Sequence, residues 1–75
     1  YNFLLKKQNN VCAICALPET RKIYGIVAKL CVDHCHDTGR VRGLLCSKCN
    51  QAIGLMKDLS QNLRKAADYL DHYNA

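Results

Sequence analysis

The pattern of apolar and polar positions along the chain predicts a small α+β domain. Apolar residues 3–5, followed by two lysines, indicate a short helix that ends near the asparagines at 9–10. β-branched and apolar residues over 23–32 and again over 40–45 predict two strands, and Gly25 leaves room for a turn or bulge in the first. A threonine and a glycine at 38–39 separate them, so we expect the two segments to pair as an antiparallel hairpin.

Two further helices are predicted after the hairpin. A short helix over 50–56 begins at the second cysteine pair, and Gly54 weakens or ends it. Over 59–73, apolar residues recur at helical spacing with charged residues on the other faces, which is typical of an amphipathic helix. Asp58 and Gln61 stand three positions apart at its start and predict a capping box with Asp58 as the N-cap.

The chain has 75 residues, which we interpret as one domain over 1–75. A core of this size rarely supplies more than about 3–5 kcal/mol of stability without a metal, a disulfide or a partner chain. Six cysteines are present, and four of them form two C-x-x-C pairs, Cys12/Cys15 and Cys46/Cys49. Four thiolates suit a closed, tetrahedral structural Zn²⁺ site. Structural zinc contributes roughly 10–16 kcal/mol in small peptides, more than this core could supply.

The cysteines also allow other interpretations. Disulfides or a redox-active C-x-x-C are the alternatives to zinc, and the absence of a secretory signal and of a βαβ pattern favours zinc. We interpret Cys31 and Cys35 as small buried hydrophobic residues, because two complete pairs already fill a zinc site. A second zinc site that combines them with His34 and His36 is the alternative.

The charge of the chain favours a polyanionic partner. Lys and Arg number 11 against 6 Asp and Glu, which gives a formal net charge of +5. Solubility alone would also explain this excess. The sequence shows no apolar signal-like start and no stretch long enough to span a membrane, so we expect a reduced, cytoplasmic protein without a membrane partner.

Residues that carry chemistry gather between and beside the cysteine pairs. Asp33, His34 and His36 lie at the end of the first predicted strand, and Asn50 directly follows Cys49. Hydrolysis of a phosphodiester needs an activated water, a divalent cation and groups that hold the phosphate in line. Asp and Asn oxygens suit Mg²⁺, and a neutral histidine takes a proton from water near pH 7.

Three basic residues, Arg40, Arg42 and Lys48, follow this segment closely. They are candidates for binding the DNA backbone through charge-assisted hydrogen bonds. An ordinary solvated hairpin face is the alternative interpretation. The density of acidic, basic and histidine side chains in this short segment favours a nucleic-acid site.

The string LCVDHCHDTGRVRGLLCSKCNQAIG resembles the signature of the recombination endonuclease VII family, a branch of the HNH nucleases with the ββα-metal (His-Me finger) fold. The upstream Cys12/Cys15 pair and the downstream segment DLSQNLRKAADYL extend the resemblance over most of the chain. It implies a small α+β, zinc-stapled domain. The ββα core would span about 23–56, flanked by a C-terminal helix at about 59–73.

By this resemblance, Asp33 and Asn50 hold one catalytic Mg²⁺ or Mn²⁺ ion. His34 is the general base, His36 helps to position the scissile phosphate, and cleavage leaves a 5′-phosphate and a 3′-hydroxyl. In an ideal strand Asp33 points away from both histidines, so we infer from the family a twist, a bulge or a strand end at this point. The best-known resolving members carry an acidic residue one helical turn after the asparagine, where this chain has Ile53.

The sequence thus predicts a Mg²⁺-dependent DNA endonuclease. A zinc-dependent nucleic-acid-binding module without catalysis is the alternative, and a structural zinc ribbon that docks onto a partner protein through its last helix is a third interpretation. Junction-resolving members of the family dimerise through long helices beyond the nuclease module, so a homodimer is one state to test. The resemblance also suggests a phage or bacterial origin, and so the interior of a bacterial cell.

Overall fold

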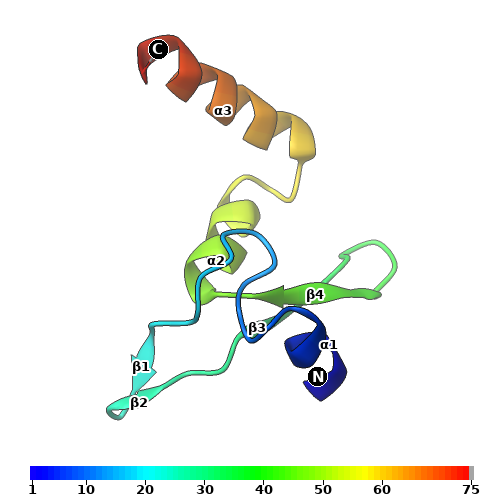
Figure 1. Ribbon diagram of the computed structural model, residues 1–75. Helices are drawn as coiled ribbons and strands as arrows, with labels where there is room; N and C mark the ends of the chain where they lie inside the picture. The colour runs from blue at the N-terminus through cyan, green and yellow to red at the C-terminus, as the bar shows by residue number, and fades with distance from the viewer. Residues whose placement is uncertain (75) are drawn as a thin grey trace.

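A computed structural model describes residues 1–74; Ala75, the last residue of the predicted domain, lies outside the described residues. The elements follow in the order α1 (Asn2–Lys7), β1 (Lys22–Ile23), β2 (Ile26–Val27), β3 (Cys31–His34), β4 (Val41–Leu45), α2 (Ser47–Leu55) and α3 (Ser60–Asn74). Figure 1 shows α2 beside the β3–β4 hairpin, the β1–β2 hairpin projecting at one end, and α3 leading away from the rest. The α+β class is confirmed.

The predicted hairpin is present as the antiparallel pair β3–β4. Asp33 lies opposite Gly43, and the register then shifts so that His34 lies opposite Val41. Arg42 is therefore the extra residue of a β-bulge on β4. An irregularity thus lies at the expected place, but its extra residue is on β4. Asp33 is buried and His34 is exposed, so the two still alternate along β3, which ends at His34.

Residues 23–32 do not form a single strand, and that prediction is wrong. Tyr24 and Gly25 have φ angles of 51° and 80°, the pair of positive values that a type I′ hairpin turn requires. The turn folds the segment back on itself, with Ile23 opposite Ile26 in the small β1–β2 hairpin. Only the end of the predicted strand, from Cys31 onward, reaches β4. The sequence allowed a turn or bulge at Gly25, but the turn also needs a positive φ at Tyr24, where a non-glycine residue rarely adopts one.

The core is small and lies around the cysteine pairs. Its buried apolar residues among those described are Cys12, Leu30, Leu44, Leu45 and Cys46. Leu4 and Leu5 of α1 and Cys49 and Ile53 of α2 pack against them and are partly buried. Because two of the five buried positions are candidate metal ligands, the stability of this core depends on what the cysteines bind.

The side chain of Gln8, just after α1, hydrogen-bonds to the backbone of β4 as a neighbouring strand would. The amide nitrogen of Gln8 donates to the carbonyl of Leu44 at 2.9 Å, and its oxygen accepts from the N–H of Leu44 at 3.0 Å. At the edge of a sheet the backbone N–H and C=O groups have no partner strand, and Gln8 binds both of these groups of Leu44. The side chain also donates to the carbonyl of Val11, which fixes the turn after α1.

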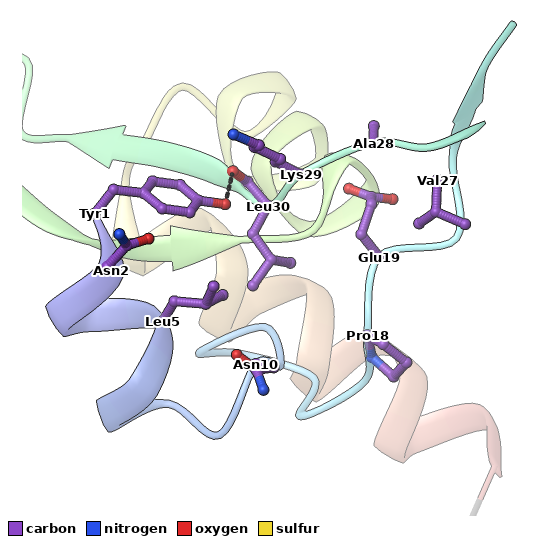
Figure 2. A pocket seen from close by; sticks show the side chains of 10 residues that line it. All are labelled: Tyr1, Asn2, Leu5, Asn10, Pro18, Glu19, Val27, Ala28, Lys29 and Leu30. Atoms are coloured by element: carbon purple, nitrogen blue, oxygen red, sulfur yellow. Dashed lines mark hydrogen bonds between the residues drawn. The ribbon is translucent and has the colours of Figure 1, made fainter.

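A second contact of α1 closes one side of a surface hollow. The hydroxyl of Tyr1 donates to the carbonyl of Leu30 at 3.0 Å, as Figure 2 shows. The hollow has a volume of about 280 Å³ and lies between α1 and the segment that leads from β2 into β3. Its one buried charged side chain, Glu19, is satisfied by protein groups, and no buried polar side-chain atom of the described residues lacks a partner.

Helix α2 begins at Ser47, earlier than the predicted residue 50, because Cys46 is its N-cap and its Sγ accepts from the N–H of Cys49. The helix ends one residue after Gly54.

The predicted capping box at the start of α3 is wrong. Asp58 lies in the turn before α3 and uses its carboxylate elsewhere, as described below.

Helix α3 has nearly the predicted bounds and extends away from the core (Figure 1). Its apolar residues remain largely exposed, including Leu63, Leu70 and Tyr73. The side chain of Asn62 donates to the carbonyl of Met56 and fixes the first turn of α3 to the end of α2. Within residues 1–74, no helix is both long enough and apolar enough to cross a membrane.

Candidate metal centre and functional site

The structure brings the two predicted cysteine pairs together. The Sγ atoms of Cys12, Cys15, Cys46 and Cys49 all lie within 4.8 Å of one another. A zinc ion with four bonds of about 2.3 Å in a tetrahedron separates its sulfur ligands by about 3.8 Å. The Cys15 and Cys46 sulfurs are 3.8 Å apart. The donor set and its spacing are therefore consistent with a structural zinc site, and all six cysteines of the chain are free of disulfides.

Both C-x-x-C segments form tight turns that aim N–H groups at sulfur. Cys12 Sγ accepts from the N–H of Ile14 and Cys46 Sγ accepts from that of Cys49, each at 3.4 Å. Burial raises the pKa of the Cys12 thiol, but N–H groups of Cys15, Cys46 and Ile14 outweigh it and lower the pKa to about 6. Burial and the neighbouring sulfurs raise the pKa of Cys49 to about 12. Four thiolates this close repel one another, and a divalent cation offsets that repulsion.

Glu19 connects the first cysteine turn to the start of α2, and the sequence analysis missed it. Its carboxylate accepts from the N–H groups of Thr20 and Arg21, each at 2.9 Å, and from the N–H and hydroxyl of Ser47. The N–H of Arg21, followed by the groups of Ser47, lowers the pKa of Glu19 to about 2 even though burial acts in the opposite direction. An anionic side chain at a helix N-terminus satisfies N–H groups that have no partner inside the helix.

The second cluster of charge lies at the bulge. Arg42 donates from Nε to Asp33 Oδ2 at 2.6 Å and from Nη2 to Asp33 Oδ1 at 2.9 Å. Its Nη2 also donates to Asp58 Oδ1 at 3.1 Å. In an unbroken ladder Arg42 would lie opposite His34 and on the other face from Asp33; the bulge lets it reach Asp33. Two carboxylates, those of Asp33 and Asp58, therefore compensate the positive charge of Arg42.

Asp58, which the sequence predicted to cap α3, lies instead in the turn that ends α2. Lys57 and Asp58 both have positive φ, 58° and 59°, and the N–H of Asp58 bonds to the carbonyl of Ile53 at 2.8 Å. This is the closing bond of a Schellman motif at the end of α2. The hydrogen bond from Arg42 lowers the pKa of Asp58, and the charge of His36 makes a smaller contribution in the same direction.

The predicted catalytic residues lie on the elements expected for them. His34 is the exposed last residue of β3, and His36 is exposed in the turn that follows. Asn50 is half-buried in the first turn of α2. Helix α2 starts beside the Leu45 end of the hairpin and contacts both strands, and the turn that follows it reaches Arg42. Across residues 1–74, no side-chain hydrogen bond occupies His34, His36 or Asn50.

The remaining predicted residues separate into two groups. Arg40 and Lys48 are exposed, and neither forms an ion pair with any described carboxylate, whereas Arg42 does. Cys31 and Cys35 are half-buried, not fully buried as predicted. Within the described part of the chain, the four-cysteine cluster is the one group of His, Cys, Asp and Glu close enough to hold a metal, so a second zinc site gains no support.

Comparison with known proteins gives one family. The family model for recombination endonuclease VII matches residues 1–72. The Gene 59 proteins of Mycobacterium phages D29 and L5 are 44% and 39% identical to the chain over 64 residues. Each match covers 84% of this chain and 36% of the phage protein, so the chain spans little more than a third of these relatives. No solved structure matches the chain significantly.

Proposed function

Because the chain belongs to the recombination endonuclease VII family, we propose that it is a DNA endonuclease whose β3–β4 hairpin and α2 form a ββα-metal (HNH) nuclease core. In support, a helix that contacts both strands directly follows the hairpin, and the four-cysteine cluster lies at their junction. The single observation that carries the assignment is the order of two paired strands followed by a helix that contacts both, with Asp33 and His34 at the end of β3 and Asn50 in that helix.

Asp33 and Asn50 would hold the catalytic Mg²⁺ or Mn²⁺. Carboxylate and amide oxygens suit these ions, and Mg²⁺ keeps several waters, so few protein ligands are needed. An ionised carboxylate has about four lone-pair sites, and Arg42 uses two of those on Asp33, so coordination capacity remains. When bound, the ion polarises the phosphate and stabilises the leaving oxygen.

His34 is the proposed general base. Its exposed imidazole, free of protein partners in the described residues, is accessible to a water molecule and a phosphate. In the neutral form it takes a proton as the water oxygen bonds to phosphorus. The bond from phosphorus to the 3′ oxygen breaks, which leaves a 5′-phosphate and a 3′-hydroxyl. His36, in the adjacent turn, positions the phosphate, while Ile53 packs against the core and supplies no auxiliary acid.

Arg40 and Lys48 are the proposed contacts to the DNA backbone. Both are exposed and free of carboxylate partners among residues 1–74. Lys48 lies in the first turn of α2, and Arg40 directly precedes β4, so they would bind phosphates on either side of the site. Such contacts give affinity that falls with salt and is independent of sequence.

A non-catalytic nucleic-acid-binding module is the second candidate, and one observation favours it. Both oxygens of Asp33 accept from Arg42, an arrangement that by itself needs no metal ion. In that case the bulge would serve the ion pair alone. The zinc site, the basic residues and the fold would all be retained, and Mg²⁺ would have no effect.

A plasmid assay separates the two candidates. Zinc-loaded protein is incubated with supercoiled plasmid in Mg²⁺, in Mn²⁺ and in EDTA at fixed ionic strength, for a time too short for EDTA to remove the structural zinc. Nicked or linear product that requires Mg²⁺ or Mn²⁺ supports the endonuclease. Intact plasmid in all three conditions, together with salt-sensitive binding of a DNA duplex, supports the binding module and contradicts the endonuclease.

A further inference from the structure

The carboxylate of Asp33, assigned above to the catalytic ion, is covered by Arg42. The two side chains form a bidentate pair with distances of 2.6 and 2.9 Å. The side chain of Asp33 is 11% exposed and that of Arg42 is 38% exposed, so the arginine is the solvent-facing member of the pair. A ligand that approaches from solvent meets the guanidinium before it meets the carboxylate.

Two separate features of the fold hold Arg42 in this position. The bulge makes Arg42 the unpaired residue of β4, between Gly43 and Val41, which pair with Asp33 and His34. The Schellman turn after α2 supplies the second acceptor, Asp58, at 3.1 Å from Nη2. Asp58 adopts a left-handed backbone that non-glycine residues rarely take. Strained backbone of this kind is found where the surrounding structure has a use for it.

Electrostatics determines how ligands affect this pair. A divalent cation that approaches Asp33 with Arg42 in place is repelled by the guanidinium at short range. A DNA phosphate has the opposite effect, because a guanidinium binds phosphate in the same bidentate way as it binds carboxylate. Asp33 and Asp58 together carry more negative charge than Arg42 neutralises, so the site attracts a cation once the guanidinium has moved.

We infer that Arg42 is a substrate-gated cover on Asp33: a backbone phosphate of bound DNA takes the guanidinium and thereby frees the carboxylate for the divalent ion. The inference rests on the proposed function, because it needs DNA and a metal ion at the same site. It adds an order of events, with DNA binding before tight metal binding. Arg42 then acts as a positioning residue, and Asp58 keeps its guanidinium close to the site.

The first test uses wild-type, zinc-loaded protein and the ¹⁵N–¹H signal of the Arg42 side-chain Nε–H group. This N–H is donated to Asp33, so its chemical shift reports the pair. We expect millimolar Mg²⁺ alone to leave the signal in place and a DNA duplex without divalent ions to move it. The inference is overturned if Mg²⁺ alone moves the signal, or if DNA binds and the signal does not move.

The second test measures Mn²⁺ affinity of the free protein by electron paramagnetic resonance. Arg42→Gln removes the covering charge, and we expect Mn²⁺ to bind at least about tenfold tighter than to wild type. Arg40→Gln makes the same charge change two residues away, at an exposed position without a carboxylate partner in the described chain, and should have a much smaller effect. Equal affinities for wild type and Arg42→Gln would contradict the inference.

Both outcomes are separable from failure of the proposed function. Zinc content and thermal unfolding show whether Arg42→Gln folds. If this variant does not fold, the response of the wild-type Arg42 Nε–H signal to Mg²⁺ and to DNA tests the inference by itself. If the protein cleaves plasmid but Arg42 does not respond to DNA, the cover is refuted and the endonuclease stands. If no plasmid is cleaved with any divalent ion, the proposed endonuclease function is refuted, and with it the inference that rests on it.

Discussion

Glu19 and Ser47, separated by 28 residues in the chain, are joined by two hydrogen bonds. The N–H of Ser47 donates to Oε2 of Glu19 at 2.7 Å, and the hydroxyl of Ser47 donates to Oε1 at 3.1 Å. Ser47 is the first residue of α2, and Glu19 follows the first cysteine turn. The pair therefore fixes α2 relative to the metal centre independently of the cysteines.

Replacing the charge of Glu19 should lower stability in a pH-dependent way. The variant Glu19→Gln keeps the shape but loses charge-assisted hydrogen bonds, so we expect the unfolding midpoint at pH 7 to fall by roughly 4–8 °C, equivalent to about 1 kcal/mol in a domain of this size. The folded pKa of about 2 lies below the ordinary 4.5. The stabilisation by ionised Glu19 is thus fully present above pH 4.5 and is lost as the pH falls toward 2.

The check is a comparison of urea midpoints for wild type and Glu19→Gln at several pH values with zinc in excess. Loss of zinc in acid affects both proteins, so the difference between them isolates Glu19. That difference should be constant above pH 4.5 and shrink below it. A difference that grows on acidification would show that the charge of Glu19 does not stabilise the fold.

Lys57→Gly should stabilise the protein. Lys57 has a φ of 58° at the position after the end of α2, where glycine is the usual residue of a Schellman motif. Removing Cβ relieves a left-handed conformation that costs roughly 1–2 kcal/mol, less the entropy that glycine loses on folding. We expect a gain of about 0.5–1 kcal/mol in the free energy of unfolding, measured by urea titration.

Lys48→Gly is the matched control for this prediction. It makes the same replacement inside α2, where the backbone is right-handed, and should destabilise by about 1 kcal/mol. Destabilisation by both variants would mean that the side chain of Lys57 contributes more than its backbone conformation costs.

Removing the metal should unfold the domain. Among the described residues the buried apolar core includes only three leucines besides two of the clustered cysteines, so the hydrophobic contribution is small. We expect wild type to contain one equivalent of zinc, and a strong chelator to abolish the helical circular dichroism signal. Cys46→Ser should have the same effect without a chelator, whereas Cys31→Ser, outside the cluster, should retain zinc and structure. An unchanged spectrum after chelation would contradict a structural role for the metal.

A homodimer stays a prediction, and α3 is the element through which we expect it. Leu70 is 58% exposed and Leu63 is 36% exposed on a helix that leads away from the core. Light scattering after size exclusion should give the mass of two chains for wild type. Leu70→Lys should give the mass of one chain, and Asp71→Lys, on a neighbouring polar position, should not. A monomeric wild type would refute the dimer.

The sequence was most informative where spacing alone fixes geometry. Two C-x-x-C pairs predicted a cluster that the structure forms, because each pair directs both of its sulfurs to one point. The hairpin, the helix after it and the amphipathic last helix also followed from periodicity. The family resemblance led us to expect a twist, a bulge or a strand end near Asp33 and His34, and the structure has a bulge there, with its extra residue on β4.

Most of the features that were missed depend on contacts between distant residues. The local turn at Tyr24 and Gly25 is the exception: Gly25 left room for it, but it also uses a left-handed backbone at an aromatic residue, which is rare. Glu19 and Gln8 find their partners 28 and 36 residues away, and no local pattern signals such pairs. Asp58 was interpreted as a helix cap because its spacing to Gln61 fits one. A stronger partner, Arg42, takes its carboxylate instead.

The proposed nuclease site requires His34 as its general base. The deciding measurement is the rate of supercoiled-plasmid cleavage in Mg²⁺ by zinc-loaded wild type, His34→Ala and His72→Ala, where His72 is an exposed histidine on α3. We predict that His34→Ala lowers the rate by at least about 10²-fold, the usual range for loss of a general base, with zinc content and DNA affinity unchanged, and that His72→Ala cleaves like wild type. Cleavage by His34→Ala at the wild-type rate would contradict the assigned site.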